Sequence, residues 1–186
     1  TLAPEYGAMA VGPEPGSTGY WVSDSDTVTA RACLFDDLFS FAEEGTFANV
    51  MGGETWVETW QGIEAEACAT PVAPHDGSSS YSYAYDPDTA TITLSGVGAH
   101  LGLPKVVSGA AELSNPADAP ESVTYQVVAN GQDTMTVQVA YSGGYWTFKL
   151  VRDGTAEAPE AGTNSIFSLA SDGMLEARGS SIGNTP

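Results

Sequence analysis

The sequence predicts an all-β domain, and three observations favour that class. Apolar and polar residues alternate along several short segments, and clusters of Gly, Pro, Asn, Asp and Ser separate these segments. No stretch repeats apolar residues with helical spacing over three turns. The chain has 186 residues, 42% of them hydrophobic, and is long enough to bury one core. We expect an antiparallel β-sandwich of jelly-roll type, with a closed lipocalin-like barrel as the alternative, because alternating strands joined by turns build both.

The first regular structure is expected in a hairpin. Residues 1–32 are rich in Gly, Pro, Ser and Asp, which break regular structure, so this part should be irregular. Within residues 34–50, Leu38–Phe41 and Thr46–Val50 alternate on either side of Gly45, a pattern typical of a β-hairpin.

Two aromatic alternations follow, at Trp56–Trp60 and Tyr81–Tyr85. In each of them, residues i, i+2 and i+4 share one face of a strand. A turn at Asp86–Thr89 then leads into another strand at Thr91–Leu94. The remaining strands are expected at Val97–Leu101, Ser122–Val128, Thr134–Tyr141 and Tyr145–Val151.

The composition divides the chain into a β domain, residues 1–152, and a linker with a C-terminal tail, residues 153–186. Asp153–Gly162 is rich in Ala, Glu, Pro and Gly, a composition typical of linkers. Beyond it, Ser165–Leu169 predicts one more strand, followed by a turn at 171–174.

The charge excludes several classes of partner. There are 24 acidic residues against 5 basic ones, a formal net charge of -19. Nucleic acid is excluded, because phosphate binding needs clustered Lys and Arg. Docking on an anionic membrane is disfavoured, and no apolar stretch is long enough for membrane insertion. The low Lys content and the many Gly, Ser and Thr residues favour an extracellular or cell-surface protein, whose export signal we expect to have been removed.

The two cysteines, Cys33 and Cys68, are too few for a disulfide framework and lack the paired spacing of a zinc site. We predict one disulfide, which suits an extracellular protein. The alternative is two separate buried thiols.

Aromatic residues are the most informative feature for function. Many of them stand among Gly, Ser, Asp and Asn, where rings can form platforms for the apolar faces of sugars. The predicted stacking residues are Trp21, Trp56, Trp60, Tyr83 and Trp146. The alternative for each of them is a place in the β core.

Acidic pairs suggest a metal site. Asp24 and Asp26, or Asp36 and Asp37, could supply oxygen ligands to calcium, although the full loop motif of a calcium-binding hand is missing. The alternative is that these side chains cap turns and accept backbone N–H groups.

Residues for catalysis are few. Neither His75 nor His100 belongs to a metal-binding pair, and we expect His75 in a loop and His100 in the core or at a strand edge. Glu54 and Glu58 are spaced to share one strand face, which resembles the catalytic strand of family 16 glycoside hydrolases. Trp56 stands where that family's motif has an aspartate, so a hydrolase is the enzymatic alternative and a non-catalytic protein is favoured.

A set of aromatic and turn motifs runs through residues 1–152. These motifs are Ala10–Pro13, Tyr20–Trp21, Cys33–Phe41, Glu44–Phe47, Glu54–Trp56, Gly102–Lys105 and Tyr145–Leu150. Together they resemble a β-rich module of secreted bacterial proteins that often accompanies family 16 glycoside hydrolases and surface glycan-binding proteins. The resemblance implies a carbohydrate-related role and assigns no binding residue.

These observations predict a secreted, non-catalytic domain that binds polysaccharide. A neutral or cationic glycan suits the charge better than a sulfated one, unless calcium bridges the two. The alternative is a homo-oligomeric subunit of an extracellular filament or surface layer. Such a subunit would assemble by adding a strand, from the tail or the N-terminal segment, to a neighbour's sheet edge.

Overall fold

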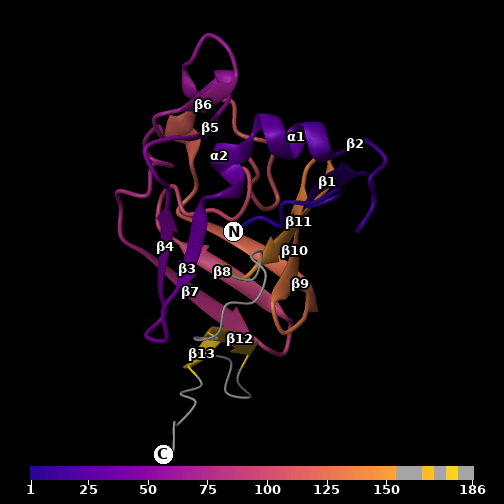
Figure 1. The fold of residues 1–186 in the computed structure, drawn as a ribbon, viewed down its shortest axis with the longest axis vertical. Helices are drawn as coiled ribbons and strands as arrows, with labels where there is room; N and C mark the ends of the chain where they lie inside the picture. The colour runs from indigo at the N-terminus through magenta and orange to yellow at the C-terminus, as the bar shows by residue number, and fades with distance from the viewer. Residues whose placement is uncertain (154–164, 170–174, 180–186) are drawn as a thin grey trace, which may run out of the picture.

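The computed structural model describes residues 1–153, 165–169 and 175–179 (Figure 1). It confirms the all-β prediction, because most of the regular structure in the described chain is antiparallel strand, and nine of these strands form one large sheet. The strands of this sheet, in chain order, are β1 (Met9–Gly12), β2 (Trp21–Val22), β3 (Leu38–Phe41), β4 (Thr46–Val50), β7 (Tyr81–Asp86), β8 (Thr91–Ser95), β9 (Ser122–Asn130), β10 (Thr134–Tyr141) and β11 (Gly144–Val151). Their order in space is β2-β1-β11-β10-β9-β8-β7-β4-β3.

Smaller elements complete the fold. A second sheet pairs β5 with β6, and a third pairs β12 with β13. These strands are β5 (Thr55–Val57), β6 (Ala67–Ala69), β12 (Ser165–Leu169) and β13 (Leu175–Gly179). The helices are short, namely α1 (Ser25–Ala30), α2 (Ala32–Phe35), η1 (Thr59–Gln61) and η2 (Pro116–Asp118). No helix in the described part of the chain is long and apolar enough to cross a membrane.

The large sheet is open, as in a sandwich. Figure 1 shows β3–β4 and β1–β11 on opposite sides of the view, with β7–β9 crossing obliquely between them. The ladder starts at β2 and ends at β3, and these two strands do not pair with each other. The barrel alternative is therefore wrong, because a barrel needs a ladder that returns to its first strand.

The core lies on one face of the sheet. In β8, Ile92 and Leu94 are fully buried, whereas the alternate residues Thr91 and Thr93 point to the other face. Three loop residues, Leu101, Leu103 and Val106, fill the same core from residues 97–107. Gly102 makes this packing possible, because its φ of +72° suits glycine and a Cβ there would lie 2.4 Å from the Phe148 ring.

The opposite face of the sheet is mostly polar. The hydroxyl groups of Thr93 and Thr124 lie 2.9 Å apart across β8 and β9, and Gln138 Nε2 donates to Thr147 Oγ1 across β10 and β11. Alternation of apolar and polar residues thus decides which face is buried, as expected for an antiparallel sheet.

The N-terminal segment is more regular than predicted. β1 lies between β2 and β11, with Met9 opposite Phe148, and all four of its residues are buried. The Thr1 nitrogen also donates to Val151 O at 3.1 Å. The flanking Gly and Pro residues obscure this four-residue strand in the sequence, because a run this short has no measurable periodicity.

Three other expectations for strands are wrong. Leu34 and Phe35 belong to α2, and their side chains are buried. Val97–Leu101 is a loop, because Gly98 adopts a φ of +97° against the Pro74 carbonyl. The strand expected at Trp56–Trp60 ends at Val57, since the next residue caps the 3-10 helix η1.

β11 ends at Val151, next to the predicted domain boundary at residue 152, and the division into two parts stays a prediction. The strand predicted at Ser165–Leu169 is β12. Most of the predicted linker and the turn predicted at 171–174 lie outside the described residues.

Candidate functional site

The four tryptophans of the chain come together in one group with four charged residues. The Trp21 and Trp146 rings have centroids 6.0 Å apart. The Arg31 guanidinium lies 4.6 Å from the Trp56 ring and 5.8 Å from the Trp21 ring, and Lys105 Nζ lies 5.7 Å from the Trp146 ring. We call this group the tryptophan cluster: Trp21, Trp56, Trp60, Trp146, Arg31, Lys105, Glu58 and Glu112.

Strand register and the disulfide position the aromatic side chains. Val11 of β1 lies opposite Trp21 on one side and Trp146 on the other, which places these two rings in one row across three strands. Trp56 lies opposite Cys68 in the β5–β6 pair, and Cys68 is bonded to Cys33 of α2. The predicted disulfide is therefore confirmed, and it holds the Trp56 strand pair against α2.

Charges link the remaining members of the tryptophan cluster. Lys105 Nζ lies 3.0 Å from Glu58 Oε1 and 3.8 Å from Glu112 Oε2. Trp60 Nε1 donates to Glu58 Oε2 at 2.9 Å, and Trp146 Nε1 donates to Glu112 Oε1 at 2.6 Å. The Lys105 ammonium thus lies between two carboxylates, and each carboxylate also accepts a hydrogen bond from one indole N–H group. Glu58 is buried, and the hydrogen bonds from Lys105 and Trp60 offset part of the hydration that its carboxylate loses.

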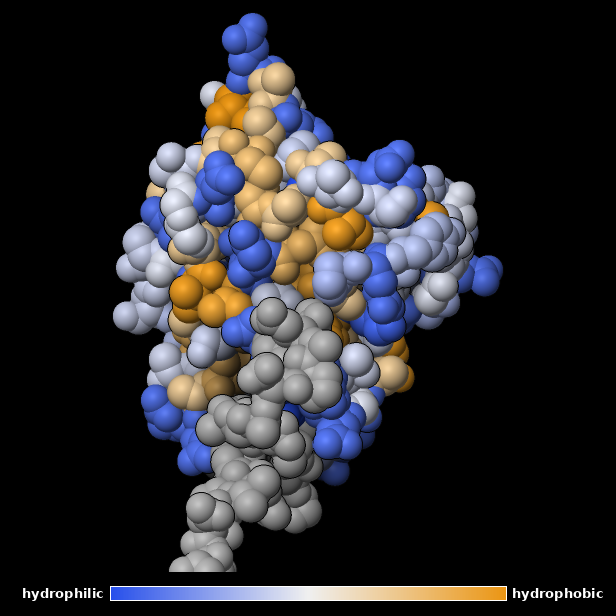
Figure 2. Space-filling model, viewed as in Figure 1, coloured by the Kyte–Doolittle hydropathy of each residue, from blue (hydrophilic) through white to orange (hydrophobic). Residues whose placement is uncertain are grey.

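Two tyrosines border the tryptophan cluster. Tyr20 precedes β2, is 59% exposed, and its N–H donates to Val11 O. The pKa of Tyr141 is raised by partial desolvation and by the nearby Glu112 carboxylate and Tyr20. The exposed ring of Tyr20 and the half-buried ring of Tyr141 therefore lie near the half-buried carboxylate of Glu112. Figure 2 shows hydrophobic residues reaching the surface in the half of the molecule that carries α2 and β5.

Of the five predicted stacking residues, Trp146 belongs to the tryptophan cluster but is 5% exposed and part of the core, where its ring stacks on Phe148. Tyr83 lies away from the tryptophan cluster. Its ring meets Phe41 edge-to-face at 5.1 Å, and its hydroxyl donates to Ala42 O at 3.0 Å. Tyr83 is 9% exposed and belongs to the core, which is the alternative considered for it above.

The carboxylates predicted to bind calcium have other roles in the structure. Asp24 is the N-cap of α1, where it accepts from Thr27 N–H at 2.8 Å, and Asp26 lies in the first turn of the same helix. Negative charge at these positions stabilises a helix start.

Asp36 and Asp37 differ in exposure to solvent. Asp36 is exposed, whereas Asp37 is buried and its Oδ2 accepts from Thr55 Oγ1 at 2.5 Å. Among the described residues, no three His, Cys, Asp or Glu side chains form a group that could hold a metal ion. Calcium binding stays a prediction.

The two histidines, which the sequence places in separate roles, lie together. Both are buried, with ring centroids 5.9 Å apart, and His75 also meets the Trp60 ring at 5.6 Å. Burial lowers the pKa of each to about 4, so both are neutral at pH 7. His100 Nδ1 lies 2.9 Å from Gly98 O, which holds that ring in place.

Glu54 and Glu58 do not share a strand face. Glu54 is exposed ahead of β5, whereas Glu58 is buried after β5 and bound to Lys105. Glycoside hydrolysis needs two carboxyl groups on either side of a sugar, which these positions do not provide.

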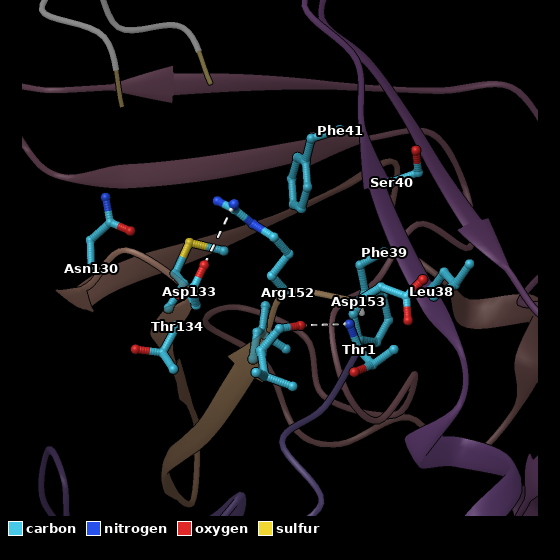
Figure 3. Close-up of a pocket in the computed structure, with 13 residues that line it drawn as sticks. Thr1, Leu38, Phe39, Ser40, Phe41, Asn130, Asp133, Thr134, Arg152 and Asp153 are labelled. Carbon is cyan, nitrogen blue, oxygen red and sulfur yellow. Dashed lines mark hydrogen bonds and ion pairs between the residues drawn. The ribbon is translucent and has the colours of Figure 1, made fainter. Parts of the chain in front are cut away.

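A separate cleft of about 320 Å³ lies between β3 and the ends of β10 and β11 (Figure 3). Its residues come from the ends of distant strands, so nothing in the sequence brings them together. Three members of the tryptophan cluster, Arg31, Lys105 and Glu112, were also not predicted from the sequence. One feature of the sequence could have pointed to them: in a chain with only five basic residues, each cation is expected to attract carboxylates.

Comparison with known proteins adds no relative. A search of protein-family models finds no match to this chain, and a search of curated proteins finds none either. The resemblance to the β-rich module of secreted bacterial proteins therefore stays a prediction.

Proposed function

We propose that this protein is a secreted, non-catalytic domain that binds a neutral polysaccharide at the tryptophan cluster. One observation carries the proposal: four tryptophans from distant parts of the chain meet beside two tyrosines, an ammonium and two carboxylates. Rings supply contact for the apolar faces of sugars, and nearby charged groups and amides accept or donate hydrogen bonds to hydroxyls.

The distribution of charge supports an uncharged ligand. Among the side chains that the structure describes, all four basic ones pair with a carboxylate. These pairs are Arg31–Glu66, Lys105–Glu58, Lys149–Glu5 and Arg152–Asp133. An anionic glycan would meet a net charge of -19 and have to displace one of these pairs. A neutral glycan meets neither obstacle.

The disulfide supports a location outside the cytoplasm. Cys33 and Cys68 are bonded across 35 residues, and disulfides persist in oxidising compartments. A secreted glycan-binding domain accounts for the disulfide, the aromatic cluster and the acidic surface together.

The test is affinity electrophoresis of the full chain against a panel of neutral polysaccharides, with a sulfated polysaccharide as the charge control. Tyr20→Ala removes an exposed ring at the border of the tryptophan cluster and should weaken binding about tenfold, the loss of roughly 1.4 kcal/mol. Tyr6→Ala is the matched control, because Tyr6 is 71% exposed and, within the described part of the chain, no ring contact or hydrogen bond joins it to the cluster.

The outcomes separate the alternatives. Binding that Tyr20→Ala weakens and Tyr6→Ala leaves unchanged supports the proposal. Binding that both variants weaken equally indicates general surface adhesion and contradicts it. No retardation on any neutral polysaccharide would refute the proposal.

A filament or surface-layer subunit is the second candidate. The observation that favours it is the open ladder of the large sheet, whose two end strands, β2 and β3, do not pair with each other. An end strand of this kind can accept a strand from another chain.

A further inference from the structure

Arg31 is the charged residue of the tryptophan cluster whose hydrogen-bonding groups are unused. Its guanidinium lies 4.6 Å from the Trp56 ring and 5.8 Å from the Trp21 ring. Stacking of this kind uses the faces of the planar guanidinium and leaves the N–H groups at its edge available. Within the part of the chain that the structure describes, these N–H groups donate no hydrogen bond. The ion-pair partner is Glu66, whose Oε2 lies 3.8 Å from Arg31 Nη2, beyond hydrogen-bond distance.

The backbone holds Arg31 and Glu66 close to each other. Arg31 lies between α1 and α2, and its backbone N–H donates to Thr27 O at 2.9 Å. Glu66 directly precedes β6. Two residues further along each of these segments, Cys33 is bonded to Cys68, so the disulfide fixes the distance between the two segments. The side chain of Arg31 is 19% exposed and that of Glu66 is 43% exposed, so a ligand can reach both.

These two side chains offer complementary hydrogen-bonding groups. A guanidinium only donates, through five N–H groups in a fixed planar fork, and an ionised carboxylate only accepts. A hydroxyl group does both. Two hydroxyls on adjacent carbons of a sugar ring can therefore accept from two N–H groups of Arg31 and donate to Glu66. An ion pair of this length near the surface contributes little to stability, so little is lost when a sugar bridges it.

We propose that Arg31 and Glu66 determine the specificity of the tryptophan cluster, by selecting neutral polysaccharides whose sugar units carry two free hydroxyls on adjacent carbons. Pyranose units in a 1,4-linked or 1,6-linked chain have such a pair, whereas those in an unbranched 1,3-linked chain do not. The carboxylate of an acidic sugar also fits the Arg31 fork, but Glu66 and the net charge of -19 oppose it. This inference rests on the glycan binding proposed above.

The test repeats the affinity electrophoresis of the full chain with unbranched neutral polysaccharides grouped by linkage. The natural protein should bind the 1,4-linked and 1,6-linked group at least about tenfold more strongly than the 1,3-linked group. Arg31→Lys keeps the positive charge but lacks the planar fork, and Glu66→Gln lacks the charged acceptor. Each of these variants should lose most of the preference between the two groups.

Glu64→Gln is the matched control for Glu66→Gln. Glu64 is also exposed, lies two positions earlier in the chain, and loses the same charge. This variant should keep the full preference. Thermal unfolding checks that each variant is folded. Glu66→Gln alters an exposed side chain, so it tests the proposal even where Arg31→Lys destabilises the domain.

The outcomes separate this inference from the proposed function. Equal binding of the two linkage groups, or a preference that persists in both Arg31→Lys and Glu66→Gln, would overturn the inference and leave the proposed function in place. Stronger binding of a 1,4-linked polyuronate than of neutral 1,4-linked chains would also overturn it, because Arg31 would then recognise a carboxylate. If no neutral polysaccharide binds, the proposed function fails, and this inference fails with it.

Discussion

Asp37 offers the most direct test of how burial acts on a single charge. Its side chain is 3% exposed, and among the described residues only its Oδ2 has a hydrogen-bond partner, Thr55 Oγ1. Burial raises the pKa of Asp37 from 3.8 to about 7, because a carboxylate loses its hydration there, while the bond from Thr55 opposes part of this rise. We therefore expect Asp37→Asn to stabilise the protein at high pH.

The magnitude follows from the two pKa values. The folded state holds its proton about 3 pH units longer than the unfolded chain, which corresponds to about 4 kcal/mol of unfolding free energy. This contribution is fully present below pH 3.8 and is lost as the pH rises through about 7. The amide introduced by Asp37→Asn cannot ionise, so the variant keeps this contribution at every pH. At pH 8 the variant should be more stable by up to about 4 kcal/mol, or about 10 °C in Tm.

The assay is urea unfolding of both proteins between pH 3.5 and 8, followed by tryptophan fluorescence. The difference in unfolding free energy should be small at pH 3.5 and grow toward pH 8. Asp36→Asn is the matched control, since it removes the adjacent exposed carboxylate and should change stability by less than about 0.5 kcal/mol. If Asp37→Asn and the natural protein keep the same difference across this range, burial does not shift the Asp37 pKa as argued.

Three further predictions concern other parts of the fold. Replacing Cys33 and Cys68 by Ser should lower the unfolding free energy by about 4 kcal/mol, because the bond closes a 35-residue loop in the unfolded chain; calorimetry under oxidising conditions measures this. Burial lowers the pKa of His75 and of His100 to about 4, so stability present above pH 6.5 should be lost as the pH falls through about 4. Urea unfolding at pH 7 and pH 4.5 should show His75→Asn to be less sensitive to acid by up to about 3 kcal/mol; equal sensitivity would contradict the shift. Gly102→Ala should cost about 2–4 kcal/mol through overpacking and backbone strain, and an unchanged Tm would exclude the tight contact with Phe148.

The sequence predicts the fold well where alternating side chains adjoin a clear turn. β8 is an example, because Ile92 and Leu94 alternate with threonines and the turn before them is rich in Asp and Pro. It fails for Met9–Gly12 and for Leu34, where the elements are four residues long. For these, contacts with distant residues decide the structure, and no local pattern records them.

The candidate site was predicted in part. The sequence identifies the four tryptophans as unusual and indicates that Lys105 attracts carboxylates, but it does not tell that these carboxylates are Glu58 and Glu112. Glu58 is dozens of positions away from Lys105 in the chain, and only the folded arrangement brings the two together. The same holds for Tyr83, since alternation places it on a strand face without telling whether that face is covered.

The position of β1 in the sheet constrains the order in which the domain folds. Met9 pairs opposite Phe148, so the first strand of the domain needs the last one as its neighbour. Contacts of such long sequence separation form slowly, because the entropy of closing the long loop between them is lost before the contacts stabilise the chain. During synthesis, residues 9–12 therefore cannot pair with β11 until that strand has left the ribosome. The sheet reaches its final form only after translation of the whole domain.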